Sequence, residues 1–233
     1  MAQALYRCTP DGEATMREHS PDYASVPSQP VEARDSAPMR PNWLALLAIC
    51  AAWFGLWYLA PGISDNGVGR LITNDPVSAI LIETVLALVL CVPLILVHRR
   101  YNQKLFARSK QIYLYAVPAA LAIALPFHYG LELPVGVYLL WMTVSVFWQD
   151  YLTFGLLQSY LRERFPAFVT VLVVAGMFYA VHAVLIPERF APTNPLPSLA
   201  IFTLGIVLAL IRTKLEAMHV ILALHLSFYF IFA

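Results

Sequence analysis

Long apolar runs fill this chain from residue 43 to its end, and they restrict the possible fold more than any other feature. Hydropathy predicts seven membrane-spanning helices, because each run matches or approaches the length needed to cross a hydrocarbon core of roughly 30 Å. The predicted spans are 43–60, 77–97, 111–127, 134–161, 167–186, 196–211 and 218–233. With 60% hydrophobic and 12% charged residues, the chain falls outside the range of soluble domains. We therefore expect an all-α, polytopic membrane helix bundle.

The first 42 residues differ from the rest, since they are rich in proline and scattered charges and show no apolar periodicity. Such a segment cannot bury enough surface to offset its ordering entropy, so we expect a disordered tail before a transmembrane domain over 43–233. Alternation of the seven spans places every Lys and Arg except Arg70 and Arg189 on one side. The positive-inside rule then predicts a cytoplasmic N-terminus and a C-terminus on the opposite side. The sequence contains no basic patch, so it does not predict a nucleic-acid partner.

Three places inside the predicted spans carry polar side chains: the pair Gln149 and Asp150, His182, and His225. An ionisable group at membrane depth costs about 2.5–3.5 kcal/mol on insertion scales, so such groups mark functional sites by default. Each residue also has a structural explanation, because a lone His often caps a carbonyl and a Gln can join two helices. The three together favour one shared cavity near the middle of the membrane.

Helical spacing shows which polar residues share a helix face, and the absence of known catalytic motifs excludes several kinds of active site. Pairs at i,i+4 share a helix face, as Phe178 does with His182 and His225 with Tyr229. Glu83 in the second span is either functional or pairs with a loop near a helix end. Neither HExxH nor GxSxG occurs, and the three cysteines are widely spaced. The sequence therefore predicts no metal, no cofactor and no serine nucleophile elbow.

The order of these polar places resembles the CAAX-protease and bacteriocin-processing (CPBP, or Abi) family of intramembrane glutamic proteases. That family carries Glu-Glu-x-x-x-Arg, usually followed by Gly, then Phe-x-x-x-His, then His-x-x-x-Asn or a variant. The corresponding stretches here are Gln149-Asp150-Tyr-Leu-Thr-Phe154-Gly155, Phe178-Tyr-Ala-Val-His182 and His225-Leu-Ser-Phe-Tyr229. The resemblance covers residues 134–233, and the first three spans contribute only their topology.

Four positions depart from the family pattern. Gln149 and Asp150 replace the two glutamates, Phe154 stands where Arg is usual, and Tyr229 where Asn is usual. Gln149 occupies the position to which the family's water-activating role is generally assigned. The chain looks like a divergent subgroup, and the proteases that accompany exosortase-linked C-terminal sorting systems are one candidate.

The resemblance implies a metal-independent intramembrane endopeptidase in the inner (plasma) membrane of a bacterium. Its substrate would be a membrane protein, or a lipidated or C-terminally anchored peptide. Asp150 would be the general base with His182 orienting the water or sharing its proton, and His225 and Tyr229 would donate to the oxyanion. Gln149 would position water or substrate. Two alternatives stay open, a noncatalytic relative that binds a membrane partner and a transporter, although no inverted repeat supports the latter.

Overall fold

The helices of the computed structural model follow the apolar runs of the sequence. The structure describes residues 42–62 and 67–233, and no strand occurs within them. The elements are α1 (Trp43–Trp57), η1 (Val68–Leu71), α2 (Pro76–Val97), α3 (Arg99–Leu105), η2 (Lys110–Tyr115), α4 (Ala116–Ala124), η3 (Leu125–Phe127), α5 (Val135–Asp150), η4 (Tyr151–Leu157), α6 (Gln158–Arg162), α7 (Ala167–Leu185), α8 (Pro187–Phe190), α9 (Pro195–Leu215) and α10 (His219–Ile231). An all-α fold is confirmed for this part of the chain.

Four helical segments are long and apolar enough to cross a membrane: Pro76–Val97, Lys110–Phe127, Ala167–Leu185 and Pro195–Leu215. They correspond to the second, third, fifth and sixth predicted spans. Their outward faces carry large exposed apolar side chains, among them Val85, Val89 and Val92 on α2. Apolar surface of this extent is typical of helices that face lipid. These helices indicate an integral membrane protein.

The other three predicted spans differ from simple membrane helices. α1 has 15 residues and α10 has 13; at 1.5 Å per residue α10 covers about 20 Å, short of the roughly 30 Å core. The fourth span is helical over 135–162, but a π-helical turn interrupts it after Asp150. A total of seven spans therefore stays a prediction.

Local chemistry explains where several helices begin and end. Asn42 caps α1 by accepting a hydrogen bond from the Ala45 amide at 2.7 Å, whereas the rest of the predicted tail lies outside the described residues. Asp75 caps α2 in the same way, and Pro76 follows at the first helical position. The predicted loop 98–110 contains α3, so it is partly helical.

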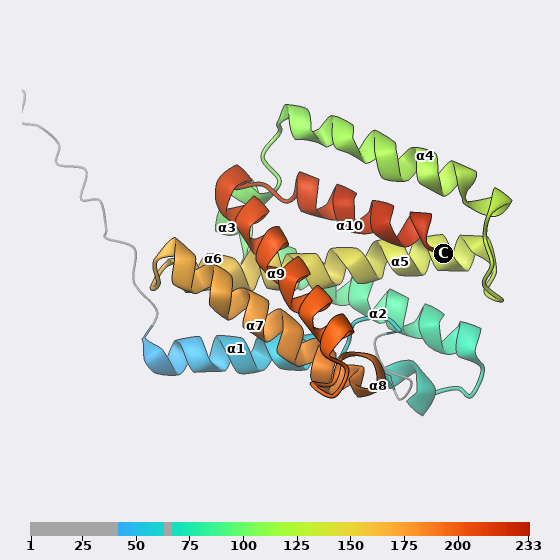
Figure 1. The fold of residues 1–233 in the computed structure, drawn as a ribbon, viewed down its shortest axis with the longest axis horizontal. Helices are drawn as coiled ribbons and strands as arrows, with labels where there is room; N and C mark the ends of the chain where they lie inside the picture. Colours follow the sequence, from blue (N-terminus) through green and yellow to red (C-terminus); the bar gives the residue numbers. More distant parts are fainter. Residues whose placement is uncertain (1–41, 63–66) are drawn as a thin grey trace, which may run out of the picture. The chain divides into compact units, whose positions relative to one another are not determined.

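The α5–η4 segment lies at the centre of the described residues (Figure 1). α2 and α10 pack against α5, and η4 is contacted by α1, α3, α6, α7 and α9. All seven residues of η4 are consequently buried. The helix that carries the Gln149–Asp150 pair is therefore the one that most other helices surround, which removes its polar groups from lipid.

Candidate functional site

Asp150 is the last residue of α5 and is completely buried. Its Oδ1 atom lies 3.0 Å from Nδ1 of His225, which α10 brings to this point. A carboxylate can only accept hydrogen bonds, so Nδ1 of His225 carries the proton and donates it. An isolated buried charge is strongly unfavourable. The pairing of α5 with α10 thus explains how a carboxylate is retained at this depth.

The second carboxylate oxygen of Asp150 distinguishes this pair from a saturated structural contact. Oδ2 is buried, and no side chain or backbone group among the described residues donates a hydrogen bond to it. Most buried polar atoms in folded proteins have a partner, so such an exception requires an explanation. Oδ2 is an open acceptor that can take a hydrogen bond, or a proton, from a water molecule or a substrate.

Tyr229 completes the part of the site that α10 supplies. Its ring stacks on that of His225, with centroids 5.3 Å apart and an interplanar angle of 26°. The hydroxyl of Tyr138 on α5 donates to the backbone oxygen of Tyr229 at 3.0 Å. α10 is therefore held to α5 at two points, by the His225 bond at the carboxylate and by this second bond nearer the start of α5.

His182 on α7 has one ring nitrogen occupied and one left as an acceptor. Nδ1 lies 2.7 Å from the carbonyl oxygen of Phe178, so Nδ1 donates and Nε2 carries a lone pair in the neutral ring. The imidazole lies within a wall of aromatic rings, with centroid distances of 4.5 Å to Phe178, 5.0 Å to Trp57 and 5.4 Å to Phe190. These contacts fix the direction in which Nε2 points.

The hydrogen bond to Asp150 comes from His225, not from His182. The sequence-based mechanism paired the carboxylate with His182, but α10 packs directly on α5 whereas α7 packs most extensively on α9. The imidazole of His182 interacts electrostatically with that of His225, while its direct contacts are with Phe178, Trp57 and Phe190. The structure thus joins Asp150, His225 and Tyr229 directly.

Gln149 faces another way. Adjacent residues on an α-helix point about 100° apart, and the Gln149 amide donates to Oγ of Ser145 at 3.0 Å rather than turning toward α10. Ser145 in turn donates to the backbone oxygen of Pro61 at 3.1 Å, and Trp141 donates to the same oxygen at 2.7 Å. Gln149 therefore belongs to a chain of bonds that holds the loop after α1 against α5.

Of the two roles that the sequence allowed for Glu83, the structure shows pairing with a loop. Its two carboxylate oxygens accept hydrogen bonds from the backbone amides of Gly62, at 2.8 Å, and Gly69, at 2.9 Å. Both glycines are required by close packing, because an added Cβ would collide with the Trp141 ring at Gly62 and with the backbone of Ala79 at Gly69. Glu83 fastens the two ends of this loop to α2.

Two features of the site were not predicted from the sequence. The π-helical turn η4 begins directly after Asp150, and such turns occur frequently at functional sites. The Trp57 indole donates to Oγ1 of Thr153 within this turn at 3.0 Å while its ring packs on His182. α1, which was expected to contribute only its topology, therefore connects the π-helical turn to His182.

Across residues 42–62 and 67–233, no three His, Cys, Asp or Glu side chains are grouped so as to hold a metal ion. The carboxylate of Asp150, the imidazole of His225 and the phenol of Tyr229 can transfer protons and form hydrogen bonds.

No protein-family model, curated protein or solved structure matches this chain.

Proposed function

We propose that this protein is an intramembrane endopeptidase that cleaves a membrane protein, or a lipidated or C-terminally anchored peptide, with Asp150 as general base. The observation that carries the proposal is the buried Asp150–His225 pair, in which one carboxylate oxygen is bonded and the other is an open acceptor. The resemblance of the three motifs to the CPBP family supports the same reaction.

In the proposed reaction, Oδ2 of Asp150 removes a proton from a water molecule while the water oxygen attacks the peptide carbonyl carbon. Nε2 of His182 accepts the second hydrogen of that water and orients it. The π electrons of the carbonyl move to its oxygen, which receives hydrogen bonds from Nε2 of protonated His225 and from the Tyr229 hydroxyl. Asp150 then returns the proton to the amide nitrogen as the carbon–nitrogen bond breaks.

The topology proposed with this function has seven spans in a bacterial inner membrane, with the N-terminus cytoplasmic. The charge bias supports it, since Arg70 and Arg189 alone fall on the other side. The short α1 and α10 would then cross only part of the bilayer. Short spans of this kind bring water nearer to a buried site, which a hydrolase needs.

A noncatalytic, partner-binding protein of the same fold is the second candidate, and one observation favours it. Asp150 is 0% exposed, so water reaches Oδ2 only when the surrounding helices separate. In this alternative the Asp150–His225 pair serves only to join α5 to α10.

The two candidates are separated by reconstituting the full-length protein in vesicles with membrane proteins extracted from a host that lacks it. New protein termini are then identified by mass spectrometry. Wild-type protein should produce termini that Asp150→Asn does not, because Asn keeps the shape of the side chain but cannot accept the proton. Equal sets of termini from two well-folded preparations would refute the peptidase.

Gln149→Glu serves as a matched control, because it restores the first family carboxylate. If Asp150 alone suffices, this change is neutral or harmful, since adjacent carboxylates in a low-dielectric site disfavour each other's ionisation. Cleavage that appears only in Gln149→Glu would identify the natural chain as the noncatalytic relative.

A further inference from the structure

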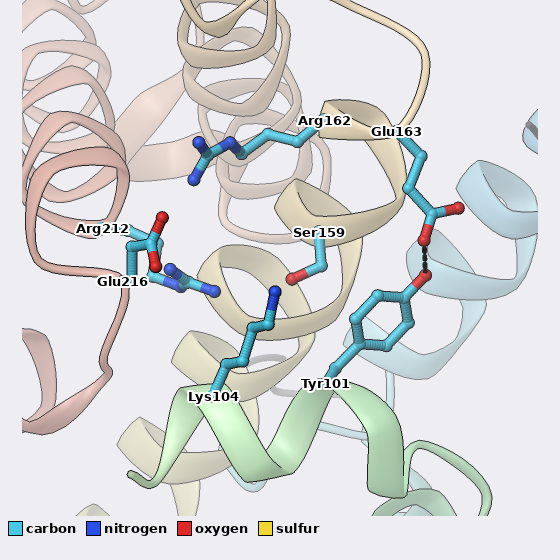
Figure 2. A pocket seen from close by; sticks show the side chains of 7 residues that line it. All are labelled: Tyr101, Lys104, Ser159, Arg162, Glu163, Arg212 and Glu216. Carbon is cyan, nitrogen blue, oxygen red and sulfur yellow. Dashed lines mark hydrogen bonds between the residues drawn. The ribbon is translucent and has the colours of Figure 1, made fainter. Parts of the chain in front are cut away.

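A second polar site lies where α3, α6 and α9 meet, on the side to which the charge bias assigns the cytoplasm. It is a cavity of about 250 Å³ lined by Tyr101, Lys104, Ser159, Arg162, Glu163, Arg212 and Glu216 (Figure 2). The proposed peptidase reaction uses none of these residues.

Arg212 is the unusual member of this lining. The residue is only 6% exposed, and its buried Nε and Nη1 atoms have no hydrogen-bond partner among the residues that the structure describes. A guanidinium carries five N–H donors and cannot lose its charge in a protein. A buried charge without bonds is strongly destabilising, so these donors indicate a missing acceptor.

The surrounding charges indicate that this acceptor is an anion. Figure 2 shows the side chains of Lys104, Arg162 and Arg212 pointing toward the same space. Glu163 does not neutralise them, because it accepts hydrogen bonds from Arg100 at 3.0 Å and from Tyr101 at 2.6 Å. Three cations thus face one remaining carboxylate, that of Glu216.

The position of the cavity favours a phosphate group at the membrane surface. Arg212 lies in the last turn of α9, one of the four helices able to cross a membrane. Just after α6 ends at Arg162, the guanidinium of Arg164 lies over the Trp43 ring at 3.9 Å, and Trp43 packs on Phe165. Aromatic and basic side chains gather in this way at lipid headgroups.

We propose that Arg212, Lys104 and Arg162 bind the phosphate of a membrane lipid headgroup or a phosphate ion of the same chemistry. Basic pockets between helix ends on the cytoplasmic side recognise anionic headgroups in this way. Arg212 is the buried cation that binds the phosphate at the base of the cavity, while Lys104 and Arg162 bind it from the exposed rim.

The test measures the melting temperature of the full-length protein in a neutral detergent. Phosphatidic acid is compared with diacylglycerol, which has the same acyl chains but no phosphate, and inorganic phosphate is compared with chloride at equal ionic strength. At about 100 times its Kd a ligand should raise the melting temperature of a protein of this size by about 5–10 °C. A shift with phosphatidic acid alone identifies the lipid as the source, and a shift with both probes admits free phosphate.

The double variant Lys104→Gln/Arg162→Gln should lose most of this shift. Its matched control is Arg99→Gln/Arg108→Gln, which removes the same charge from exposed positions on either side of Lys104 in the sequence that do not line the cavity. The control should keep the full shift. Equal losses in both variants, or no shift with either probe in wild-type protein, would overturn the proposal.

Arg212→Met tests the buried charge without depending on the rim. Met fills similar space without a charge, so without phosphate this variant should melt above the wild type, and phosphatidic acid should no longer stabilise it. A variant that melts below the wild type and still responds to phosphatidic acid would show that Arg212 does not bind the phosphate. None of these measurements depends on peptide cleavage, so the two proposals can fail separately.

Discussion

Asp150 and Arg212 are both more than nine-tenths buried, but their hydrogen bonding differs. Oδ1 of Asp150 is bonded to His225, which α10 supplies. Nε and Nη1 of Arg212 have no hydrogen-bond partner within the part of the chain that the structure describes, and the guanidinium shares its cavity with two other cations and one remaining carboxylate, that of Glu216. In the two proposals, the first site takes its side chains from the chain and needs only a water molecule, whereas the second needs a phosphate group to pair with Arg212.

The largest effect is expected at the Asp150 site. Asp150→Asn should lower peptide cleavage by at least about 10²-fold, the lower end of general acid–base contributions. His182→Ala should have a similar effect, and the double variant should lose little more, because the residues act as one unit. Initial rates on the substrate identified in vesicles measure this. Full activity of Asp150→Asn would remove the proposed base.

Removing His225, the partner of the Asp150 carboxylate, tests how much this pair contributes to the stability of the protein. His225→Ala leaves Asp150 unpaired and should destabilise the protein by about 3–5 kcal/mol. Thermal unfolding in detergent micelles gives the value. Adding Asp150→Asn to this variant should recover part of the loss, since no charge is then stranded; additive losses would mean that the pair contributes nothing to stability.

The same experiment at the other site should have the opposite sign. Replacing a poorly paired buried charge by an apolar residue of similar volume often stabilises a protein by about 1–4 kcal/mol. We expect Arg212→Met to behave in this way in neutral detergent without phosphate, as measured by thermal unfolding. Destabilisation under these conditions would show that Arg212 already has its partner within the chain, and the contrast between the two sites would disappear.

The smallest effect is expected at Gln149, next to the most sensitive residue. Gln149→Leu removes the bond to Ser145, one turn earlier on the same helix, while keeping most of the volume, and side-chain pairs at i,i+4 contribute only about 0.2–0.5 kcal/mol. Unfolding and cleavage should both change little. A loss of cleavage comparable with that of Asp150→Asn would instead place Gln149 in the reaction. It would contradict the structural role given to Gln149, which is to help hold the loop after α1 against α5.

Much of this architecture could be predicted from the order of apolar and polar residues. Uninterrupted runs predicted the long helices, and the insertion cost of Asp150 and His225 predicted that both lie away from lipid, as their burial and their hydrogen bond show. The pairing of Asp150 with His225 rather than His182 could not be predicted, because it depends on how each helix is rotated about its axis. Periodicity within a single helix does not determine the rotation of two helices relative to each other.

Other features left little signal in the sequence. An arginine at the end of a membrane helix usually extends to solvent, so nothing distinguished Arg212 from Arg164 until the packing of α3, α6 and α9 was known. Trp57 lies in a span without motifs, and its bond to Thr153 joins residues 96 positions apart. Such contacts depend on tertiary packing, which hydropathy does not describe.

The π-helical turn η4 separates Asp150 from Ser159 and Arg162 on what is otherwise one continuous helix. A π-helical turn holds about one residue more than an α-helical turn, so it shifts the angular phase of everything beyond it by roughly 100°. Both sites therefore depend on the length of this segment as well as on its side chains. Losing one apolar residue from it would rotate Arg162 on α6 away from Arg212 while leaving every ionisable residue present. In the divergence of such chains, a one-residue insertion or deletion can thus create or remove a binding site that no substitution reveals.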